Sequence, residues 1–161
     1  MWSSHKIAVD SENDYYSSDE IGVLFNKDKT TLIRFPSGSA ATTYTIPESV
    51  TTIKEGAFEG VYQGNSNLTS VIIPEGVSRL EMATFGNCNA LSSVSLPTSL
   101  SYIGLAAFSG CESLTDVYYS GTKAQFASIR KDDYWNSETG DYTIHCTDGD
   151  VAAIKDEYWH Y

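Results

Sequence analysis

The chain has 161 residues, 41% hydrophobic and 19% charged, a balance typical of one folded domain rather than of a disordered segment. Its net charge is −11 and its longest basic run is Arg130-Lys131, which excludes a nucleic-acid or anionic-membrane surface, because phosphate binding needs clustered Lys and Arg. No apolar run approaches the roughly 18 residues of a membrane-spanning helix, and residues 1–6 lack the apolar core of a signal peptide.

The first predicted elements are strands. Residues 6–10 (Lys-Ile-Ala-Val-Asp) are similar to the strand segments of the repeat described next, so we expect one more repeat strand there. Apolar runs at 22–25 and 31–35 flank a polar segment, 26–30, which predicts a β-hairpin. A chain that starts at such a strand, with no coil beneath it, is expected to be part of a longer repeat protein.

One sequence pattern then occurs three times. Each copy contains an alternating apolar segment that ends in proline, an apolar pair spaced i, i+3, and an Ala-Phe or Thr-Phe pair. The prolines are Pro47, Pro74 and Pro97, and the phenylalanines are Phe58, Phe85 and Phe108. A unit of about 23 residues cannot bury its own apolar face and must stack on its neighbours, which predicts a solenoid. The first copy is longer because of a Gly-, Asn- and Ser-rich loop insertion at 59–67.

Each segment of a coil has its own expected conformation. The alternating segment is predicted as a short strand with one face inward, closed by proline because proline cannot donate to the ladder. The i, i+3 segment fits either a second short strand or an extended turn. The Ala-Phe segment is predicted as one helical or 3₁₀ turn that places phenylalanine in the core, where Phe58, Phe85 and Phe108 would stack into a spine.

Three cysteines are present, and two of them, Cys88 and Cys111, occupy matching positions of consecutive coils. Matching positions of stacked coils lie close together, so a disulfide is geometrically conceivable. The alternative is a ladder of two small buried thiols, which a packing rule alone would produce.

The C-terminal part is predicted to close the stack. Thr122-Lys-Ala-Gln125 fits a capping box, which predicts a helix over about 122–130, with Arg130-Lys131 at its cation-favouring C-terminus. A hairpin of residues 142–146 and 151–154 is expected around the turn at 147–150.

The motif Leu-x-x-Val-x-Leu/Ile-Pro…Val-x-x-Ile…Ala-Phe-x-x-Cys resembles the BspA-like leucine-rich repeat, and residues 18–36 and 118–149 are similar to the hairpin-bearing repeat and the closing unit of that family. The resemblance implies an α/β solenoid, a right-handed superhelix of stacked strands with short helical or 3₁₀ turns and a helix-plus-hairpin cap. We expect a single domain, 1–161, with a partial repeat at 1–40, three regular repeats at 41–120 and the cap at 121–161.

Catalytic and cofactor motifs are absent from the sequence, so we expect neither an enzyme nor a bound cofactor. His145-Cys146 is the one cluster suited to zinc, but adjacent strand residues point to opposite faces and cannot both ligate easily. The acidic stretch 10–14 lacks the glycine and the terminal glutamate of a calcium loop. Trp135 is interpreted as packing in the cap, although aromatic residues also suit sugar or peptide sites.

The leading functional interpretation is a protein-binding or adhesion module, because solenoids present the same position of successive coils as one surface. The candidate binding residues are Thr45, Ile72, Ser95, Tyr118 and Tyr62. The family resemblance implies a secreted or cell-surface bacterial protein whose partner is a protein or glycan of host matrix or of another cell. We expect the chain to be a monomer. The alternatives are a structural spacer without a ligand, favoured by a flat polar strand face, and an enzyme of unrecognised type.

Overall fold

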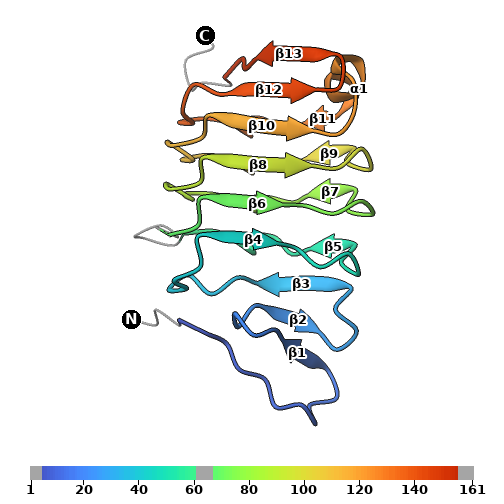
Figure 1. Cartoon of the computed structure of the whole chain (residues 1–161), viewed down its shortest axis with the longest axis vertical. Coiled ribbons are helices and arrows are strands. Elements are labelled where there is room, and N and C mark those ends of the chain that lie inside the picture. The colour runs from blue at the N-terminus through green and yellow to red at the C-terminus, as the bar shows by residue number, and fades with distance from the viewer. Residues whose placement is uncertain (1–4, 61–66, 156–161) are drawn as a thin grey trace.

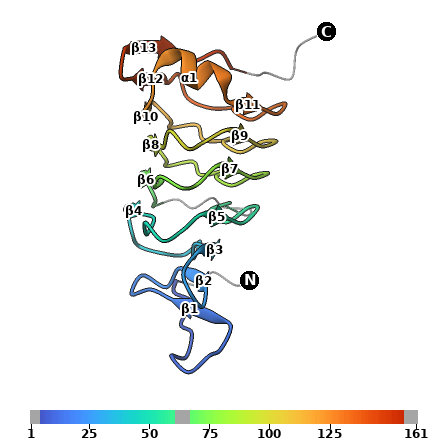
Figure 2. The same ribbon diagram turned by 90° about the vertical axis from the view of Figure 1, so that its right-hand side faces the viewer.

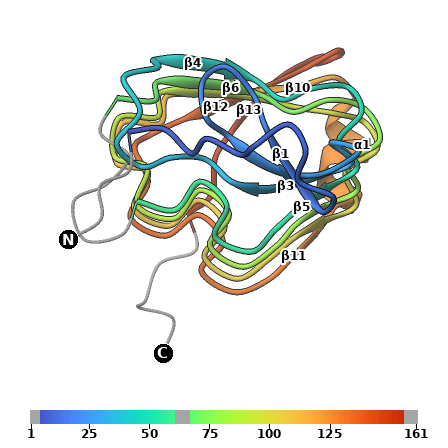
Figure 3. The ribbon, with the colours of Figure 1, turned by 90° about the horizontal axis from the view of Figure 1, so that it is seen from below.

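The computed structural model describes residues 5–60 and 67–155 and shows a stack of coils (Figure 1). The first strand of each coil lies in one six-stranded sheet, here called the main sheet, and the second strand lies on the opposite side of the stack (Figure 2). Seen from below, successive coils superpose (Figure 3). The repeat therefore folds as the solenoid that its length predicts, but as a β-solenoid with little helix rather than as the α/β solenoid that the family resemblance implies.

The main sheet has the strand order β13-β12-β10-β8-β6-β4. Its members are β4 (Thr43–Thr45), β6 (Ser70–Ile72), β8 (Ser93–Leu96), β10 (Asp116–Tyr119), β12 (Thr143–Cys146) and β13 (Gly149–Ala152). All neighbours are parallel except β13, which returns antiparallel to β12. The alternation of buried and more exposed residues along these strands matches the sequence pattern, with one face of the sheet in the core.

The i, i+3 segments, for which the sequence left a strand or a turn open, are two-residue strands. They are β5 (Thr52–Ile53), β7 (Arg79–Leu80) and β9 (Tyr102–Ile103), joined by β11 (Arg130–Lys131) in the following coil. At the N-terminal end, β3 (Thr31–Arg34) pairs in parallel with β5, and β2 (Leu24–Asn26) pairs antiparallel with β3, which confirms the expected hairpin. A further strand, β1 (Tyr16–Ser18), pairs with β2 and was not expected.

The strand expected at residues 6–10 is not formed. The Ile7 amide donates to the carbonyl of Gly22 (3.1 Å), and the Val9 amide donates to the Ser18 hydroxyl (3.0 Å). These two bonds reach a turn and a side chain instead of a neighbouring strand, so no ladder can propagate. The prediction failed because local similarity to a repeat strand does not supply a strand partner.

A column of aromatic rings runs through the core. Phe58, Phe85 and Phe108 are buried and stacked, with ring centroids 4.8 and 5.3 Å apart, and Phe35 continues the column 5.2 Å below Phe58. Trp135 meets Phe108 edge-on at 6.3 Å, so it packs at the end of the column as expected. Such ring pairs contribute about 0.5–1.5 kcal/mol each beyond their buried area.

The Ala-Phe segments are turns, and the expected helical or 3₁₀ conformation is wrong. Individual i to i−3 bonds are present, as from Ala107 to Gly104 (3.2 Å), but the residue two places before each phenylalanine has a positive φ. These residues are Gly56 (φ 63°), Ala83 (φ 54°) and Ala106 (φ 54°). A left-handed residue reverses the local winding, so consecutive turns cannot merge into a helix.

Cys88 and Cys111 are free thiols in the buried ladder that the sequence offered as the alternative to a disulfide. Each thiol donates to a carbonyl of the preceding coil, Cys88 to Phe58 (3.0 Å) and Cys111 to Phe85 (3.2 Å). Burial raises the pKa of the Cys88 thiol to about 12. Both groups are therefore neutral packing elements that also bond coil to coil.

The C-terminal part contains helix α1 (Lys123–Ser128) at the capping box. The Thr122 hydroxyl accepts from the Gln125 amide (3.2 Å), and the Gln125 side chain accepts from the Thr122 amide (2.8 Å). The helix ends before Arg130 because that residue enters β11, yet the Lys131 ammonium still donates to the carbonyls of Phe126 and Ile129. Within the described residues, no helix combines the length and hydrophobicity needed to cross a membrane.

Candidate binding face on the main sheet

The register of the main sheet aligns its outward residues into one straight row, here called the outer row. It consists of Thr45, Ile72, Ser95, Tyr118 and His145, one residue from each of five consecutive parallel strands. Four of the five candidate binding residues predicted from the sequence are thus brought together. The fifth, Tyr62, lies outside the described residues.

The centre of the outer row exposes two large side chains with a small one between them. Ile72 is 46% exposed and Tyr118 is 48% exposed, and the strand between them contributes Ser95. Strands are spaced by about 4.8 Å, so Ile72 and Tyr118 stand about 10 Å apart with only a hydroxymethyl group between them. The centre of the face therefore presents two exposed, largely apolar side chains that flank a small polar one.

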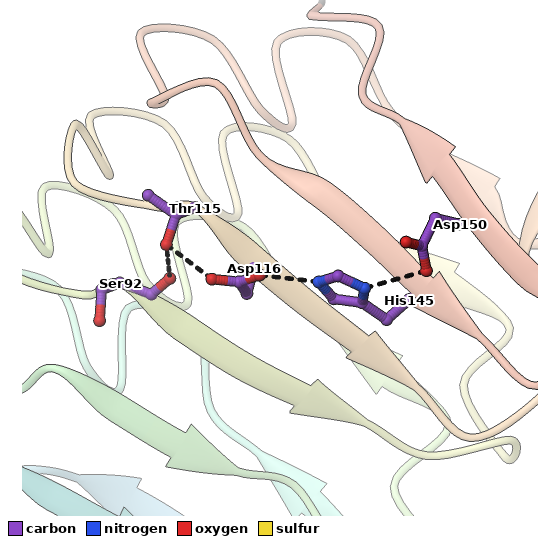
Figure 4. A network of polar contacts seen from close by, with 5 residues as sticks. All are labelled: Ser92, Thr115, Asp116, His145 and Asp150. Carbon is purple, nitrogen blue, oxygen red and sulfur yellow. Dashed lines mark hydrogen bonds and ion pairs between the residues drawn. The ribbon is translucent and has the colours of Figure 1, made fainter.

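One end of the row is fixed by His145, whose ring stacks on Tyr118 with centroids 4.9 Å apart. Its Nε2 lies 2.7 Å from a carboxylate oxygen of Asp116, and its Nδ1 lies 3.0 Å from one of Asp150 (Figure 4). These hydrogen bonds to Asp116 and Asp150 raise the pKa of His145, and the bond from His145 lowers the pKa of Asp116. A protonated ring can donate to both carboxylates, whereas a neutral ring donates to only one.

The Asp116 side chain is itself held by a ladder of hydroxyl groups. The Thr115 hydroxyl lies 2.8 Å from the second Asp116 oxygen and 3.2 Å from the Ser92 carbonyl, and its single proton serves one acceptor at a time (Figure 4). In the coils below, the Ser92 hydroxyl donates to the backbone carbonyl of Thr69 (3.1 Å), and the Thr69 hydroxyl donates to the backbone carbonyl of Thr42 (2.9 Å). These hydroxyls join coil to coil and are less available to a ligand than the outer row.

The chemistry of this face is that of a contact surface. Both ring nitrogens of His145 are engaged by carboxylates, and Cys146 pairs with Gly149 at the turn end of the hairpin while its side chain is half-buried. Over residues 5–60 and 67–155, no group of three or more His, Cys, Asp and Glu could hold a metal ion. Rigid aromatic and aliphatic groups at low conformational entropy favour recognition of another molecule.

The acidic stretch considered for calcium is occupied by its own backbone and by a lysine. Asp10 accepts from the Glu12 amide (2.9 Å), and the Asn13 side chain accepts from the amides of Tyr15 and Tyr16. The Lys27 ammonium donates to the carbonyls of Ser11 (3.0 Å) and Asn13 (2.7 Å), which places a positive charge where a cation would need oxygen ligands.

Sequence reasoning missed His145, Asp116 and Asp150 as members of the site. Tyr118 and His145 are register partners, but the interval between them is 27 residues rather than the 23 of the two coils directly before. The alternation of buried Ile144 with outward His145 was a usable signal. Asp150 could not be assigned because the hairpin turn is tighter than expected: Cys146 pairs with Gly149, so Thr147-Asp148 alone form the turn.

A second polar cluster lies on the opposite side of the stack. The Arg79 guanidinium stands 3.9 Å from the ring centre of Tyr102, and the Tyr102 hydroxyl donates to Asp132. Arg79 also pairs with Glu81 at 2.7 Å. The charges of this cluster compensate one another, which favours a structural role.

The family described as BspA type Leucine rich repeat region matches residues 34–147 as six copies of the repeat. No curated protein matches the chain.

Among solved structures, the chain is similar to the pneumococcal vaccine antigen PcpA, with 26% identity and a TM-score of 0.73 over 87% of this chain and 33% of that one. It is also similar to a leucine-rich repeat protein from Bacteroides capillosus, with 25% identity and a TM-score of 0.55 over 88% of this chain and 99% of that one. A leucine-rich repeat protein from Eubacterium ventriosum is similar as well, with 27% identity and a TM-score of 0.52 over 73% of this chain and 37% of that one. The chain thus spans about a third of the length of the pneumococcal antigen. Because the family match covers residues 34–147 and agrees with the repeat and with the strand register, the chain belongs to the BspA-type leucine-rich repeat family.

Proposed function

We propose that this chain is a non-enzymatic binding module that engages a protein partner through the outer row. The observation that carries the proposal is the exposed pair Ile72 and Tyr118 on either side of Ser95. Burying such side chains in an interface is worth about 1.5–3 kcal/mol each, and aromatic anchors dominate binding energies. Exposed apolar anchors favour a protein surface over a glycan, which would call for more hydrogen-bonding groups at the centre of the row.

The proposed setting is a bacterial surface or secreted protein of which this chain is one repeat segment. It is supported by the family and by the likeness to a pneumococcal vaccine antigen. In that setting the partner would be a protein of host matrix or of another cell, bound by a monomeric module. The net charge of −11 favours partners with basic residues around the contact.

The second candidate is a structural spacer, and one observation favours it. The residues two positions before those of the outer row, on the same face of the main sheet, are mostly small and polar. The aromatic column stiffens the stack along its length. A spacer would need rigidity without any exposed anchor.

The test is a binding screen of the chain against matrix proteins, bacterial cells and a glycan array. The double variant Ile72→Ser/Tyr118→Ser should lose at least tenfold in affinity for any protein that binds. A matched control replaces exposed hydrophobic residues elsewhere, Met82→Ser/Leu105→Ser, and should bind like the wild type. Absence of binding across the screen would support the spacer, and equal binding by both double variants would refute the outer row as the site.

A further inference from the structure

The two sides of the stack end differently at its N-terminal end. The second strand β5 is covered by β3, which pairs with it in parallel. In the main sheet, by contrast, β4 is the terminal strand. The Thr42 carbonyl accepts from Ser70, and the Ile46 amide donates to Ile72, so alternate residues from 42 to 46 face β6.

It follows that the backbone groups of Thr43 and Thr45 point away from β6. Within the described part of the chain, no hydrogen bond beyond the β4–β6 ladder is formed by their amides or carbonyls. Both residues are also exposed. An edge of this kind is a template for another strand.

A cavity of about 510 Å³ lies alongside this edge. One wall is formed by Thr43, Thr45 and Pro47, and the other by the turn at 18–21 together with Lys29. The cavity is open to solvent and lies beside a strand edge, which suits an extended segment better than a compact small molecule.

The width of the groove is fixed by Asp19. One oxygen of its carboxylate accepts from the amides of Ile21, Gly22 and Val23, and the other accepts from the Tyr44 hydroxyl at 2.7 Å. Asp19 thereby ties the far wall to β4 itself. The groove is preorganised, so a ligand does not have to open it.

We propose that this groove binds an extended, basic peptide segment of a partner protein, which adds a parallel or antiparallel strand to the free edge of β4. A second copy of this chain is disfavoured because β1, β2 and β3 project beyond β4 at the same end of the stack (Figure 1), so the end of another solenoid cannot approach the edge closely. The lining contains two carboxyl groups, on Asp19 and Glu20, against the one ammonium group of Lys29, and the whole chain has a net charge of −11, so lysine or arginine is favoured in the bound segment. Side chains at alternate positions of the segment would face the Tyr44 side and the solvent.

The probe is the synthetic peptide acetyl-Lys-Thr-Val-Thr-Val-Thr-Lys-amide, titrated into the whole chain and followed by NMR. Saturable binding should slow hydrogen exchange of the Thr43 and Thr45 amides at least tenfold. A peptide N-methylated on every residue between the two lysines has no amide there that could donate to β4, cannot form the ladder and should not bind. Protection that appears on β13 instead, equal binding of the N-methylated peptide, or no saturable binding at millimolar concentration would each overturn the proposal.

Two variants at one position separate backbone pairing from side-chain contact. Thr45→Pro removes the outward amide, which the fold does not use, and should weaken peptide binding at least tenfold, while Thr45→Val keeps the amide and should bind within twofold of the wild type. If Thr45→Pro does not fold, the proposal is decided by whether the peptide slows hydrogen exchange of the Thr43 and Thr45 amides in the wild-type chain. Ile72→Ser/Tyr118→Ser should bind the peptide normally, so this proposal and the proposed function can fail separately.

Discussion

Phe85 shows how single residues hold the stack together. Its ring is fully buried between Phe58 and Phe108, at 4.8 and 5.3 Å, so it contacts the coils on both sides at once. Removing it leaves a cavity that neither neighbour can fill without breaking its own stacking.

Phe85→Ala should therefore lower the free energy of unfolding by about 3–5 kcal/mol, measured by urea denaturation. Phe85→Leu, which retains most of the volume, should cost about 1.5 kcal/mol or less. Replacing the exposed Tyr15 by Ala should change stability by less than about 0.5 kcal/mol. If Phe85→Ala lowered the free energy of unfolding by less than about 1 kcal/mol, the aromatic column would not be a main source of core stability.

Thiol reactivity provides a second prediction at this scale. Cys88 and Cys111 are fully buried with raised pKa values, whereas Cys146 is half-buried. A thiol reagent at pH 8 should label Cys146 first, and Cys88 and Cys111 only at the rate of unfolding. Mass spectrometry of labelled peptides gives the order. Early labelling of Cys88, or a Cys88–Cys111 disulfide in the purified chain, would contradict the buried ladder.

Among the elements, the β12–β13 hairpin depends on the charge of His145. The imidazolium joins Asp116 of β10 to Asp150 of β13, and the partly exposed ring is the outward residue of β12. Because the folded pKa of His145 is raised, its stabilisation is complete below the ordinary histidine value of about 6.5 and is lost as the pH rises through the raised pKa. Because the folded pKa of Asp116 is lowered, its stabilisation of the fold is complete above the ordinary aspartate value of about pH 3.9. It is lost as the pH falls through the lowered pKa.

The hairpin should accordingly be most stable between about pH 4 and pH 6.5. His145→Gln should destabilise the chain more at pH 6 than at pH 9, and the NMR titration of His145 should give a pKa above the ordinary value. Asp150→Asn should shift that titration towards the ordinary value. A His145 titration at or below about 6.5 would contradict the two-carboxylate arrangement.

Helix α1 depends on its cap because six residues are too few for independent helicity. Thr122→Ala removes the acceptor for the Gln125 amide and should cost about 1 kcal/mol of unfolding free energy. Thr122→Ser keeps the oxygen and should cost only a few tenths of that value. Equal stability of the Ala and Ser variants would show that the cap does not contribute.

The elements also show which parts of the fold the sequence could predict. Strands, the hairpin and the capped helix followed from local patterns, because alternation and capping residues act over a few positions. The Ala-Phe turns were mispredicted because Ala83 and Ala106 have a left-handed φ, a conformation that is uncommon for alanine and that the residue type does not signal. Residues 6–10 were mispredicted because strand formation needs a partner.

For the whole molecule, the candidate site was predictable only as far as the repeat stayed regular. Ile72, Ser95 and Tyr118 were found because equal spacing guarantees alignment. His145 and Asp150 escaped because the last interval is longer and the final turn shorter than expected. Their partnership with Asp116 is a tertiary contact between three strands, which no local pattern encodes.

The proposed function makes the outer row the surface by which this solenoid recognises a protein partner. The direct measurement is NMR of the chain, with labelled isoleucine methyl and tyrosine ring groups, titrated with the partner found in the binding screen. We expect the Ile72 methyl and Tyr118 ring signals to shift, while the Tyr102 signal on the opposite side of the stack stays unchanged. Shifts confined to Tyr102 and its neighbours, with Ile72 and Tyr118 unaffected, would contradict it.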